Sequence, residues 1–142
     1  MNPPQLTEVT EDDVDMFSYK DKVMDVKITS VYDGDTFTGC FYEGGVLKKY
    51  KFRCEGYDSE EMRQARNAPN RDQAKQKARD DKQHFIDLID AYSNNTRVIQ
   101  CLCGEFDKYG RILVKVPADG SINNEMITSG HGYVYNGGTK IK

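Results

Sequence analysis

Hydrophobic and polar residues alternate over the first part of the chain in the way that is typical of short β-strands. Residues 24–31 follow a period of two in part, and residues 36–43 and 46–54 continue with strand-forming side chains. An Asp-Gly dipeptide at 33–34 and a Gly-Gly dipeptide at 44–45 separate these three runs, and both are hairpin-turn sequences. We therefore predict an antiparallel meander of three strands.

The pattern changes to a helical period in the middle of the chain. Apolar residues recur there at spacings of 4, 7, 4 and 3, which places them on one stripe of an amphipathic helix. They are Ala74, Ala78, Phe85, Ile89 and Tyr92. Asp72 is expected to cap the start of this helix, and residues 93–95 to end it. The preceding segment, 60–70, is basic, contains Pro69 and lacks an apolar period, so we expect a loop.

Two more strands are expected over residues 97–103 and 111–116, with a turn at 107–110 between them. A short helix is predicted over residues 122–129, and residues 133–135 are expected to return as a short strand. Three strands, a helix, two strands and a helix, without βαβ alternation, indicate an α+β fold that is mainly β. Five short antiparallel strands with an inserted helix fit a five-stranded OB-type β-barrel with two or three packed helices.

Length and composition are those of one globular domain. A chain of 142 residues with 37% hydrophobic residues can bury a single core. No apolar run approaches the roughly 18 residues that a membrane span needs, and the first residues lack the features of a signal peptide. We therefore expect an intracellular protein without membrane contact, and a monomer because no dimer signal is present.

The four cysteines are expected to be reduced. None belongs to a CxxC pair, and neither His84 nor His131 lies at zinc-ligand spacing from a cysteine. Reduced thiols that pack as small hydrophobic side chains agree with an intracellular location. The cysteines are Cys40, Cys54, Cys101 and Cys103.

Charge is distributed unevenly along the chain. Residues 1–25 carry seven acidic and two basic side chains, a net charge of −5, so the remainder is at +2 within a total of −3. Residues 63–82 hold seven basic residues and three aspartates. We interpret residues 1–22 as an acidic, loosely ordered arm and residues 23–142 as a domain with basic patches. The alternative, solvated helix and strand faces, accounts for part of these basic residues.

Five residues at predicted turns and strand ends have the chemistry that phosphodiester hydrolysis needs. Carboxylate oxygens are ligands for a hard cation such as Ca²⁺, which can polarise a phosphoryl oxygen and orient a water molecule. Guanidinium groups bind phosphate in bidentate fashion and stabilise charge in the transition state. The five residues are Asp35, Arg53, Asp58, Glu61 and Arg111. By spacing alone, surface salt bridges are the alternative.

The same residues carry a resemblance to a known family. Segment 33–36 (Asp-Gly-Asp-Thr), Arg53, segment 58–61 (Asp-Ser-Glu-Glu) and segment 107–111 (Asp-Lys-Tyr-Gly-Arg) occur in this order. Their order and spacing closely resemble the staphylococcal nuclease (thermonuclease) family, and the similarity runs over about residues 24–135.

The resemblance implies a fold, an activity and a metal site. The fold is a five-stranded OB barrel with helices packed on it, and the activity is Ca²⁺-dependent cleavage of DNA and RNA that leaves 3′-phosphate ends. By position, Asp35 and Asp58 would be side-chain ligands of the metal, and Ser59 would offer its backbone carbonyl oxygen.

The resemblance also assigns the catalytic and binding roles. Glu61 would orient or activate the attacking water, while Arg53 and Arg111 would hold the scissile phosphate. Lys108 and Tyr109 would line the nucleotide site. The structural alternative for Tyr109 is a turn aromatic that covers the barrel.

The chain departs from the family pattern near the catalytic glutamate. Ser59-Glu60 stands where the family usually has Thr-Pro, so the loop that carries Glu61 lacks the constraint of the proline. Glu55 stands where the family is mainly aliphatic, and its charge could pair with Arg53 and draw it away from the phosphate.

Two further features leave alternatives open. The connector over residues 62–71 is rich in arginine, and Arg63, Arg66 and Arg71 would either contact flanking phosphates or belong to a solvated loop. Near the C-terminus, Tyr133 and Tyr135 would either lie beneath a bound base or belong to the core.

Three functions from different classes are consistent with these observations. The first is a Ca²⁺-dependent nuclease acting on DNA or RNA. The second is a nucleic-acid-binding module that uses the same barrel without chemistry, and the third is a protein-interaction barrel with an acidic arm. Family members with silenced sites typically lose the metal carboxylates or the arginines, and this chain retains them all. We therefore expect the nuclease.

Overall fold

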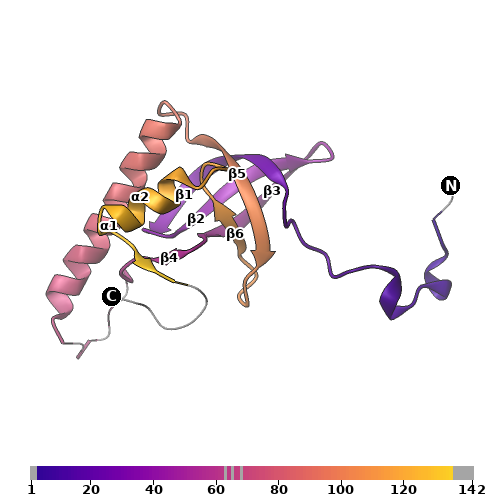
Figure 1. Cartoon of the computed structure of the whole chain (residues 1–142), viewed down its shortest axis with the longest axis horizontal. Helices are drawn as coiled ribbons and strands as arrows, with labels where there is room; N and C mark the ends of the chain where they lie inside the picture. Colours follow the sequence, from indigo (N-terminus) through magenta and orange to yellow (C-terminus); the bar gives the residue numbers. More distant parts are fainter. Residues whose placement is uncertain (1–2, 63, 65, 68, 136–142) are drawn as a thin grey trace.

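Five strands close into a barrel, and two helices pack outside it. The computed structural model describes residues 3–62, 64, 66–67 and 69–135. The strands follow one another around the barrel in the order β1–β2–β3–β6–β5 (Figure 1). They are β1 (Val23–Asp33), β2 (Thr36–Glu43), β3 (Val46–Cys54), β5 (Val98–Phe106) and β6 (Ile112–Lys115). The predicted α+β fold, a mainly β, OB-fold-like barrel of five strands with helices, is confirmed.

One pair of neighbouring strands runs in a direction that the sequence pattern did not predict. Four pairs are antiparallel, but β3 and β6 are parallel, with Phe52 opposite Ile112 and Arg53 opposite Leu113. The prediction of antiparallel strands throughout is wrong for this pair. A closed ring of five strands cannot alternate in direction at every step, so one parallel pair is unavoidable. This pair closes the barrel and places Arg53 beside β6.

Aromatic and aliphatic side chains fill the barrel. Phe37 and Phe52 stack with 5.1 Å between their ring centroids, and Phe85 of the long helix lies 6.2 Å from Phe37. All four cysteines are free, as predicted; three of them are buried in the core, and Cys40 is half-buried. Burial raises the pKa of the Cys54 thiol to about 12, so this thiol stays protonated and unreactive at neutral pH.

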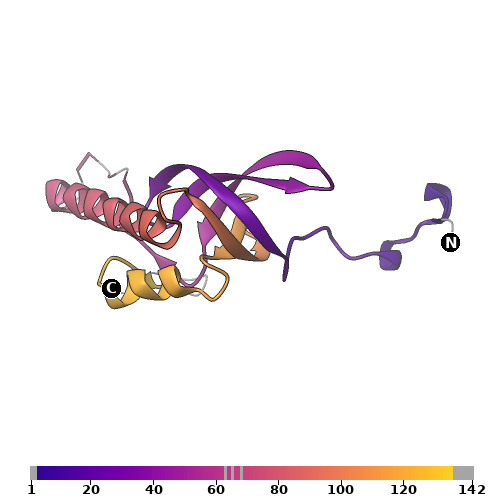
Figure 2. The same cartoon turned by 90° about the horizontal axis from the view of Figure 1, so that it is seen from above.

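The long helix α1 (Arg71–Tyr92) packs against β1 and α2 (Figures 1 and 2). The predicted N-cap is wrong: α1 begins at Arg71, and Asn70 precedes it in a left-handed conformation without a side-chain cap. Asp72 lies instead in the first turn, where its charge interacts favourably with the helix dipole. Tyr92, which the apolar stripe included, is the last helical residue and is 49% exposed.

The second helix, α2 (Ser121–Thr128), begins one residue before its predicted start. The chain then returns as β7 (Tyr133–Val134), which pairs with β4 (Tyr57–Asp58) in a separate antiparallel ladder. Tyr133 lies opposite Asp58 in this ladder. The pattern analysis missed β4, because two residues are too few to show a period. The ladder ties the C-terminal segment to the end of β3, where the site lies.

The N-terminal segment extends away from the barrel (Figures 1 and 2). Between residues 3 and 16 it is exposed, and it contains two short 3₁₀ turns, Leu6–Glu8 and Glu11–Asp13. Tyr19 is buried in the core and contacts Phe41, so the barrel domain includes residues that we assigned to the arm over 1–22. Within the described part of the chain, neither helix has the length and apolar character that would let it cross a bilayer.

Candidate active site

Arg53 lies between two carboxylates at one end of the barrel. Its Nη1 atom is 2.9 Å from Oδ2 of Asp35, and its Nη2 atom donates a hydrogen bond of 2.7 Å to Oδ1 of Asp58. The side chains of Arg53, Asp35 and Asp58 are only 9%, 5% and 17% exposed. These three residues therefore form one buried cluster, and the alternative of surface salt bridges is wrong for them.

The turn after β1 and a neighbouring loop fix the position of Asp35. Thr36 lies opposite Arg53 in the β2–β3 ladder, and its hydroxyl donates to the Asp35 carboxylate at 2.8 Å. The backbone amide of Ser59 donates to the other carboxylate oxygen, also at 2.8 Å. Gly34 is required in this turn because a Cβ atom there would lie 2.8 Å from Cβ of Ser59. A side-chain hydroxyl and a backbone amide from two separate segments of the chain thus hold one carboxylate.

Asp33 and Asp35 have pKa values shifted in opposite directions. Burial, together with the hydrogen bond and the charge of Asp35, raises the pKa of Asp33 to about 8. Burial also acts to raise the pKa of Asp35, but the hydrogen bond from Asp33, the charge of Arg53 and the Ser59 amide outweigh it and lower this pKa to about 2. Of the two carboxyl groups, Asp33 is therefore the one that takes up a proton first as the pH falls.

The donor atoms near Arg53 fit a weakly held hard cation. Asp35 and Asp58 both contact Arg53, and an interaction between their two carboxyl groups helps to lower the pKa of Asp35. Within the described ranges, no three His, Cys, Asp or Glu side chains are grouped as metal ligands. Two carboxylates and the backbone carbonyl of Ser59 are oxygen donors, which Ca²⁺ prefers, and water would complete the coordination.

The turn between β5 and β6 carries the second arginine of the site. The Asp107 carboxylate accepts hydrogen bonds of 2.9 Å from the backbone amides of Tyr109 and Arg111. It also accepts one of 2.6 Å from Nε of Arg111, whose guanidinium lies 5.3 Å from the centre of the Tyr109 ring. Asp107 thus orients the Arg111 side chain from within the same turn, through a hydrogen bond to Nε.

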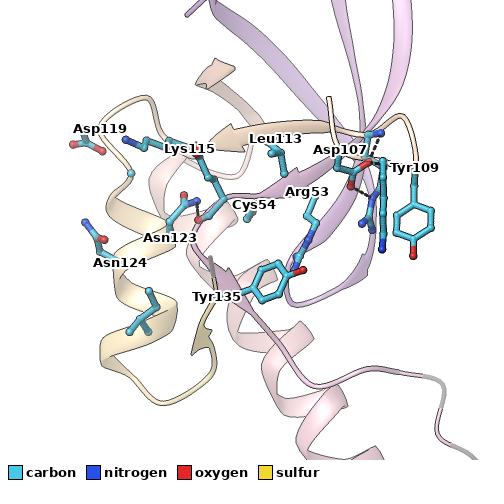
Figure 3. Close-up of a pocket in the computed structure, with 16 residues that line it drawn as sticks. Arg53, Cys54, Asp107, Tyr109, Leu113, Lys115, Asp119, Asn123, Asn124 and Tyr135 are labelled. Atoms are coloured by element: carbon cyan, nitrogen blue, oxygen red, sulfur yellow. Dashed lines mark hydrogen bonds and ion pairs between the residues drawn. The ribbon is translucent and has the colours of Figure 1, made fainter. Parts of the chain in front are cut away.

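Arg53 and the β5–β6 turn line the same pocket (Figure 3). The pocket has a volume of about 820 Å³, and Lys108, Tyr109 and Arg111 contribute to its wall. In Figure 3 the Tyr135 ring lies next to Arg53, and its centroid is 5.2 Å from the guanidinium carbon. Tyr135 is therefore a residue of the pocket wall and not of the core.

Asn123 of α2 fixes another part of the pocket wall (Figure 3). Its Oδ1 atom accepts a hydrogen bond of 2.8 Å from the amide of Val116, and its Nδ2 atom donates to the carbonyl oxygens of Glu55 and Val114. In the sequence, Asn123 belongs to a segment between Asp119 and Gly130 that shares the family resemblance, but the sequence assigns it no role. Its hydrogen bonds give no local signal in the sequence, because its partners Glu55, Val114 and Val116 lie in or next to the ends of β3 and β6, which only the fold brings close.

Glu55 does not take Arg53 from the cluster. Its side chain is exposed, and its Oε2 atom lies beside Gly104 of β5. The ion pairs of Arg53 are made with Asp35 and Asp58. The competition that the sequence suggested is therefore absent from the contacts of the described residues.

Glu61 is the predicted site residue that the structure does not bring to the cluster. Its side chain is exposed and is not part of the pocket wall among the described residues. The hydrogen bond recorded for Glu61 uses its backbone carbonyl oxygen, which accepts from the side chain of Gln64 at 2.7 Å. The other seven predicted residues lie together. Four belong to the Arg53 cluster or contact it, namely Arg53, Asp35, Asp58 and Ser59. The other three line the pocket with Arg53, namely Lys108, Tyr109 and Arg111.

A buried aspartate holds the backbone immediately before Glu61. Asp81 of α1 has no exposed surface, and its Oδ2 atom accepts a hydrogen bond of 3.1 Å from the Glu60 amide. Its Oδ1 atom lies 2.7 Å from Nζ of Lys77 and 2.9 Å from Nδ1 of His131. The Glu60 contact constrains the loop immediately before Glu61.

The sequence contained a signal for Asp81 that the pattern analysis did not use. Asp81 lies three residues after Ala78 and four before Phe85, and both of these are buried on the inner face of α1. A charged residue on an apolar stripe is either paired or functional, because burying an isolated carboxylate is costly.

The remaining expectations concern the connector and the C-terminal aromatics. Arg66 is exposed, and Arg71 is half-buried at the start of α1. Arg63 lies outside the described residues. The Tyr133 hydroxyl donates to Oε2 of Glu60 at 3.3 Å, so this side chain is attached to the loop before Glu61 and not to the core.

No model of a protein family matches the chain, and no curated protein matches it either. Function is therefore inferred from the residues of the site.

Proposed function

We propose that this chain is a Ca²⁺-dependent phosphodiesterase that cleaves DNA and RNA internally and leaves 3′-phosphate ends. The observation that carries the proposal is the buried cluster in which Arg53 contacts both Asp35 and Asp58. Arg53 also faces the same pocket as Arg111. Two cations that line one pocket, beside two carboxylates, suit a phosphodiester anion and a hard metal ion.

The two arginines bind the phosphate in this proposal. Arg111 is oriented through Nε by Asp107, so its terminal nitrogens remain for a phosphate oxygen. Arg53 is oriented by its two carboxylates. Negative charge on the phosphoryl oxygens increases as the water attacks, and positioned guanidinium groups stabilise that charge without reorganisation.

Asp35, Asp58 and the carbonyl oxygen of Ser59 would hold the Ca²⁺ ion. When bound, the ion polarises a phosphoryl oxygen and helps to orient the water. Without the ion, Arg53 forms ion pairs with both carboxylates, so the ion has to compete with these existing contacts. We therefore expect weak binding by the protein alone.

Glu61 would accept the proton of the attacking water. Its side chain is exposed and the loop is tied to α1 through the Glu60 amide, so a side-chain rotation can redirect the carboxylate while the backbone stays fixed. Hydrogen bonds of catalytic bases often become short only when substrate is bound. In this proposal the attacking water gives its proton to the Glu61 carboxylate, which is exposed to solvent until the substrate binds.

The second candidate is a binding module with the same pocket and no cleavage. One observation favours it, namely that Glu61 lies away from the Arg53 cluster in the described structure. In that case the pocket binds phosphate through both arginines, but no base acts on the water.

Cleavage of single-stranded DNA with and without Ca²⁺ separates the two candidates. The native chain is compared with an Asp35→Ala/Glu61→Gln variant, and the matched control carries the same chemical changes in the exposed arm, Asp12→Ala/Glu11→Gln. Cleavage that needs Ca²⁺, survives in the control and is lost in the site variant supports the nuclease. No cleavage by the native chain, with DNA binding intact in all three proteins, would instead support the binding module.

A further inference from the structure

Two further hollows continue the 820 Å³ pocket around the barrel. The first hollow, of about 580 Å³, shares Tyr109 and Arg111 with the pocket and extends over β1 and β2. The second hollow, of about 380 Å³, shares Tyr32 with the first and ends at Arg71 and Lys75 of α1. The pocket and the two hollows are therefore connected by shared wall residues, and we call this continuous surface the rim track.

Two exposed tyrosines mark the junctions of the rim track. Tyr109 stands between the pocket and the first hollow and is 71% exposed, and Tyr32 stands between the two hollows and is 61% exposed. Exposure alone does not mark a binding residue, but these two rings stand at the junctions of hollows that are lined by basic side chains. Exposed rings in a basic groove are the stacking platforms that single-stranded nucleic acids use, since every base has a π-face.

The charge of the two hollows is positive. Lys51 lines the first hollow, and Arg71 and Lys75 line the second. No acidic residue is among the described residues that line either hollow, although the chain has 23 Asp and Glu residues. The Nε atom of Arg71 is buried without a hydrogen-bond partner among the described groups, whereas the rest of the half-buried side chain lines the second hollow.

The Arg53 cluster lies between the pocket and the first hollow. Arg53 lines the pocket, and Thr36, its partner in the β2–β3 ladder, lines the first hollow and donates to Asp35. A polynucleotide with one phosphate at Arg53 can therefore extend in both directions. One side enters the pocket beside Tyr135, and the other side follows the first hollow towards Tyr32.

We propose that single-stranded nucleic acid binds along the whole rim track, with a base on Tyr32 and phosphates at Lys51 and at Arg71 or Lys75. The proposal rests on the proposed function for the place of the phosphate at Arg53, but the two hollows do not depend on cleavage. Binding on both sides of Arg53 explains internal cleavage, because an enzyme that held one side only would favour chain ends. The base stacks on Tyr32 only when it is unpaired, so single strands bind more tightly than duplexes.

Fluorescence anisotropy in EDTA, without cleavage, tests the proposal. The probe is a labelled single-stranded DNA of about eight nucleotides, within the roughly 4–16 nucleotides that one OB fold covers. A labelled dinucleotide that fits the pocket alone is the second probe. The variants are Tyr32→Ala and Lys51→Ala, and both side chains are exposed, so the fold is retained. The matched controls are Tyr42→Ala and Lys49→Ala, which are exposed on the same sheet and do not line either hollow.

We expect Tyr32→Ala to weaken binding of the longer probe roughly 5- to 150-fold, the range for one base stacked on an aromatic ring. Lys51→Ala should reduce the salt slope by about 0.7, the change for one phosphate contact on a single strand. Neither variant should change binding of the dinucleotide, and neither control should change binding of either probe.

Three results would overturn the rim track. They are an unchanged affinity of the longer probe in both variants, an equal effect on the dinucleotide, and duplex DNA that binds as tightly as the single strand. Failure of the proposed function has a different signature. If the native chain never cleaves but Tyr32→Ala weakens binding, the proposed function fails and the rim track is supported. If the native chain cleaves but both variants bind normally, the rim track fails and the proposed function is supported.

Discussion

Asp35 and Arg53 form an ion pair that is almost completely removed from solvent, with 2.9 Å between Oδ2 and Nη1 and side-chain exposures of 5% and 9%. Removing two charges from water is costly, and a buried pair often stabilises a fold no better than apolar residues of the same size. The pair is therefore poorly explained as a stabilising contact. It is better explained by a phosphate and a cation that would use the same groups.

Replacing Arg53 by alanine should destabilise the protein by about 3–5 kcal/mol, because Asp35 and Asp58 would remain buried without their counter-charge. Urea unfolding of the native and variant proteins measures this difference. Lys20→Ala is the control, since its contact with Glu105 is 3.9 Å long and both side chains are more than half exposed. It should change stability by about 0–1 kcal/mol. A loss below about 1 kcal/mol in Arg53→Ala would contradict the importance of the buried cluster.

Replacing Glu61 by glutamine should reduce turnover by roughly 10²-fold or more while leaving stability within about 0.5 kcal/mol. The carboxylate is exposed, so the fold does not depend on it. Single-turnover cleavage in Ca²⁺ and urea unfolding give the two values. Glu125→Gln, on the exposed side of α2, serves as the control for removal of one negative charge. Equal turnover in all three proteins would exclude Glu61 as the base.

Replacing Arg111 by alanine should also reduce turnover by roughly 10²-fold, because one preorganised contact with the phosphate is lost. Arg111→Lys should restore little of this activity, since an ammonium group cannot bind Asp107 and a phosphate in the same planar arrangement. The turn itself should persist, because the Asp107 carboxylate still accepts hydrogen bonds from the backbone amides of Tyr109 and residue 111. Wild-type rates in the lysine variant would show that charge alone is sufficient.

Calcium should bind the protein alone with a dissociation constant on the order of 10⁻⁴–10⁻³ M, and more tightly when nucleotide is present. Two carboxylates are few ligands, and Arg53 competes with the ion for both of them. Titration calorimetry with and without a nucleotide measures both values, and Asp35→Ala provides the control. Micromolar binding without nucleotide would mean that the ligand set is larger than the one proposed.

Acidification below about pH 6.5 should destabilise the fold partly through His84. Its ring stacks on His131 with 4.3 Å between the centroids, and its Nε2 atom is buried without a partner among the described groups. Burial first, and then the charge of His131, lowers the pKa of His84 below its ordinary value, while Glu125, Asp87 and Asp81 act in the opposite direction. The unfolded chain therefore takes up this proton more readily than the folded one. The contribution to stability is complete above pH 6.5 and is lost as the pH falls through the folded pKa.

Urea unfolding at about pH 7.5 and about pH 5.5 measures this dependence, and His84→Gln should lose less stability than the native protein between these two values. The glutamine keeps a polar side chain of similar length but does not titrate. An identical loss in both proteins would assign the acid sensitivity to other groups.

The fold was largely predictable because it depends on local patterns. The three-strand meander and the long helix followed from periods of two and 3.6 and from turn residues at the expected places. The parallel pairing of β3 with β6 did not follow, since no local pattern records which strands meet when a barrel closes. The β4–β7 ladder was missed because β4 has only two residues, too few to show a period, although a short strand over residues 133–135 was predicted.

The candidate site was predictable to a lesser degree. A motif resemblance selected Asp35, Arg53 and Asp58, and the structure brings these three together. It did not select Asp81, and it included Asn123 without a role, because the roles of both lie in contacts with backbone groups of distant segments. Such contacts leave no characteristic sequence, and only the packing of both helices on the barrel creates them.

The parallel seam between β3 and β6 also has a consequence for folding. Arg53 and Leu113 are neighbours across this seam, yet α1 and β5 separate them along the chain. Contacts between such distant residues form late, because a long loop must close before they contribute. The pocket that holds Arg53 and Arg111 is therefore complete only in molecules whose barrel has closed. A nucleotide bound there at about 100 times its dissociation constant would favour the closed form by about 2.7 kcal/mol. Slower amide hydrogen exchange along β6 in the presence of nucleotide would report this stabilisation of the closed barrel.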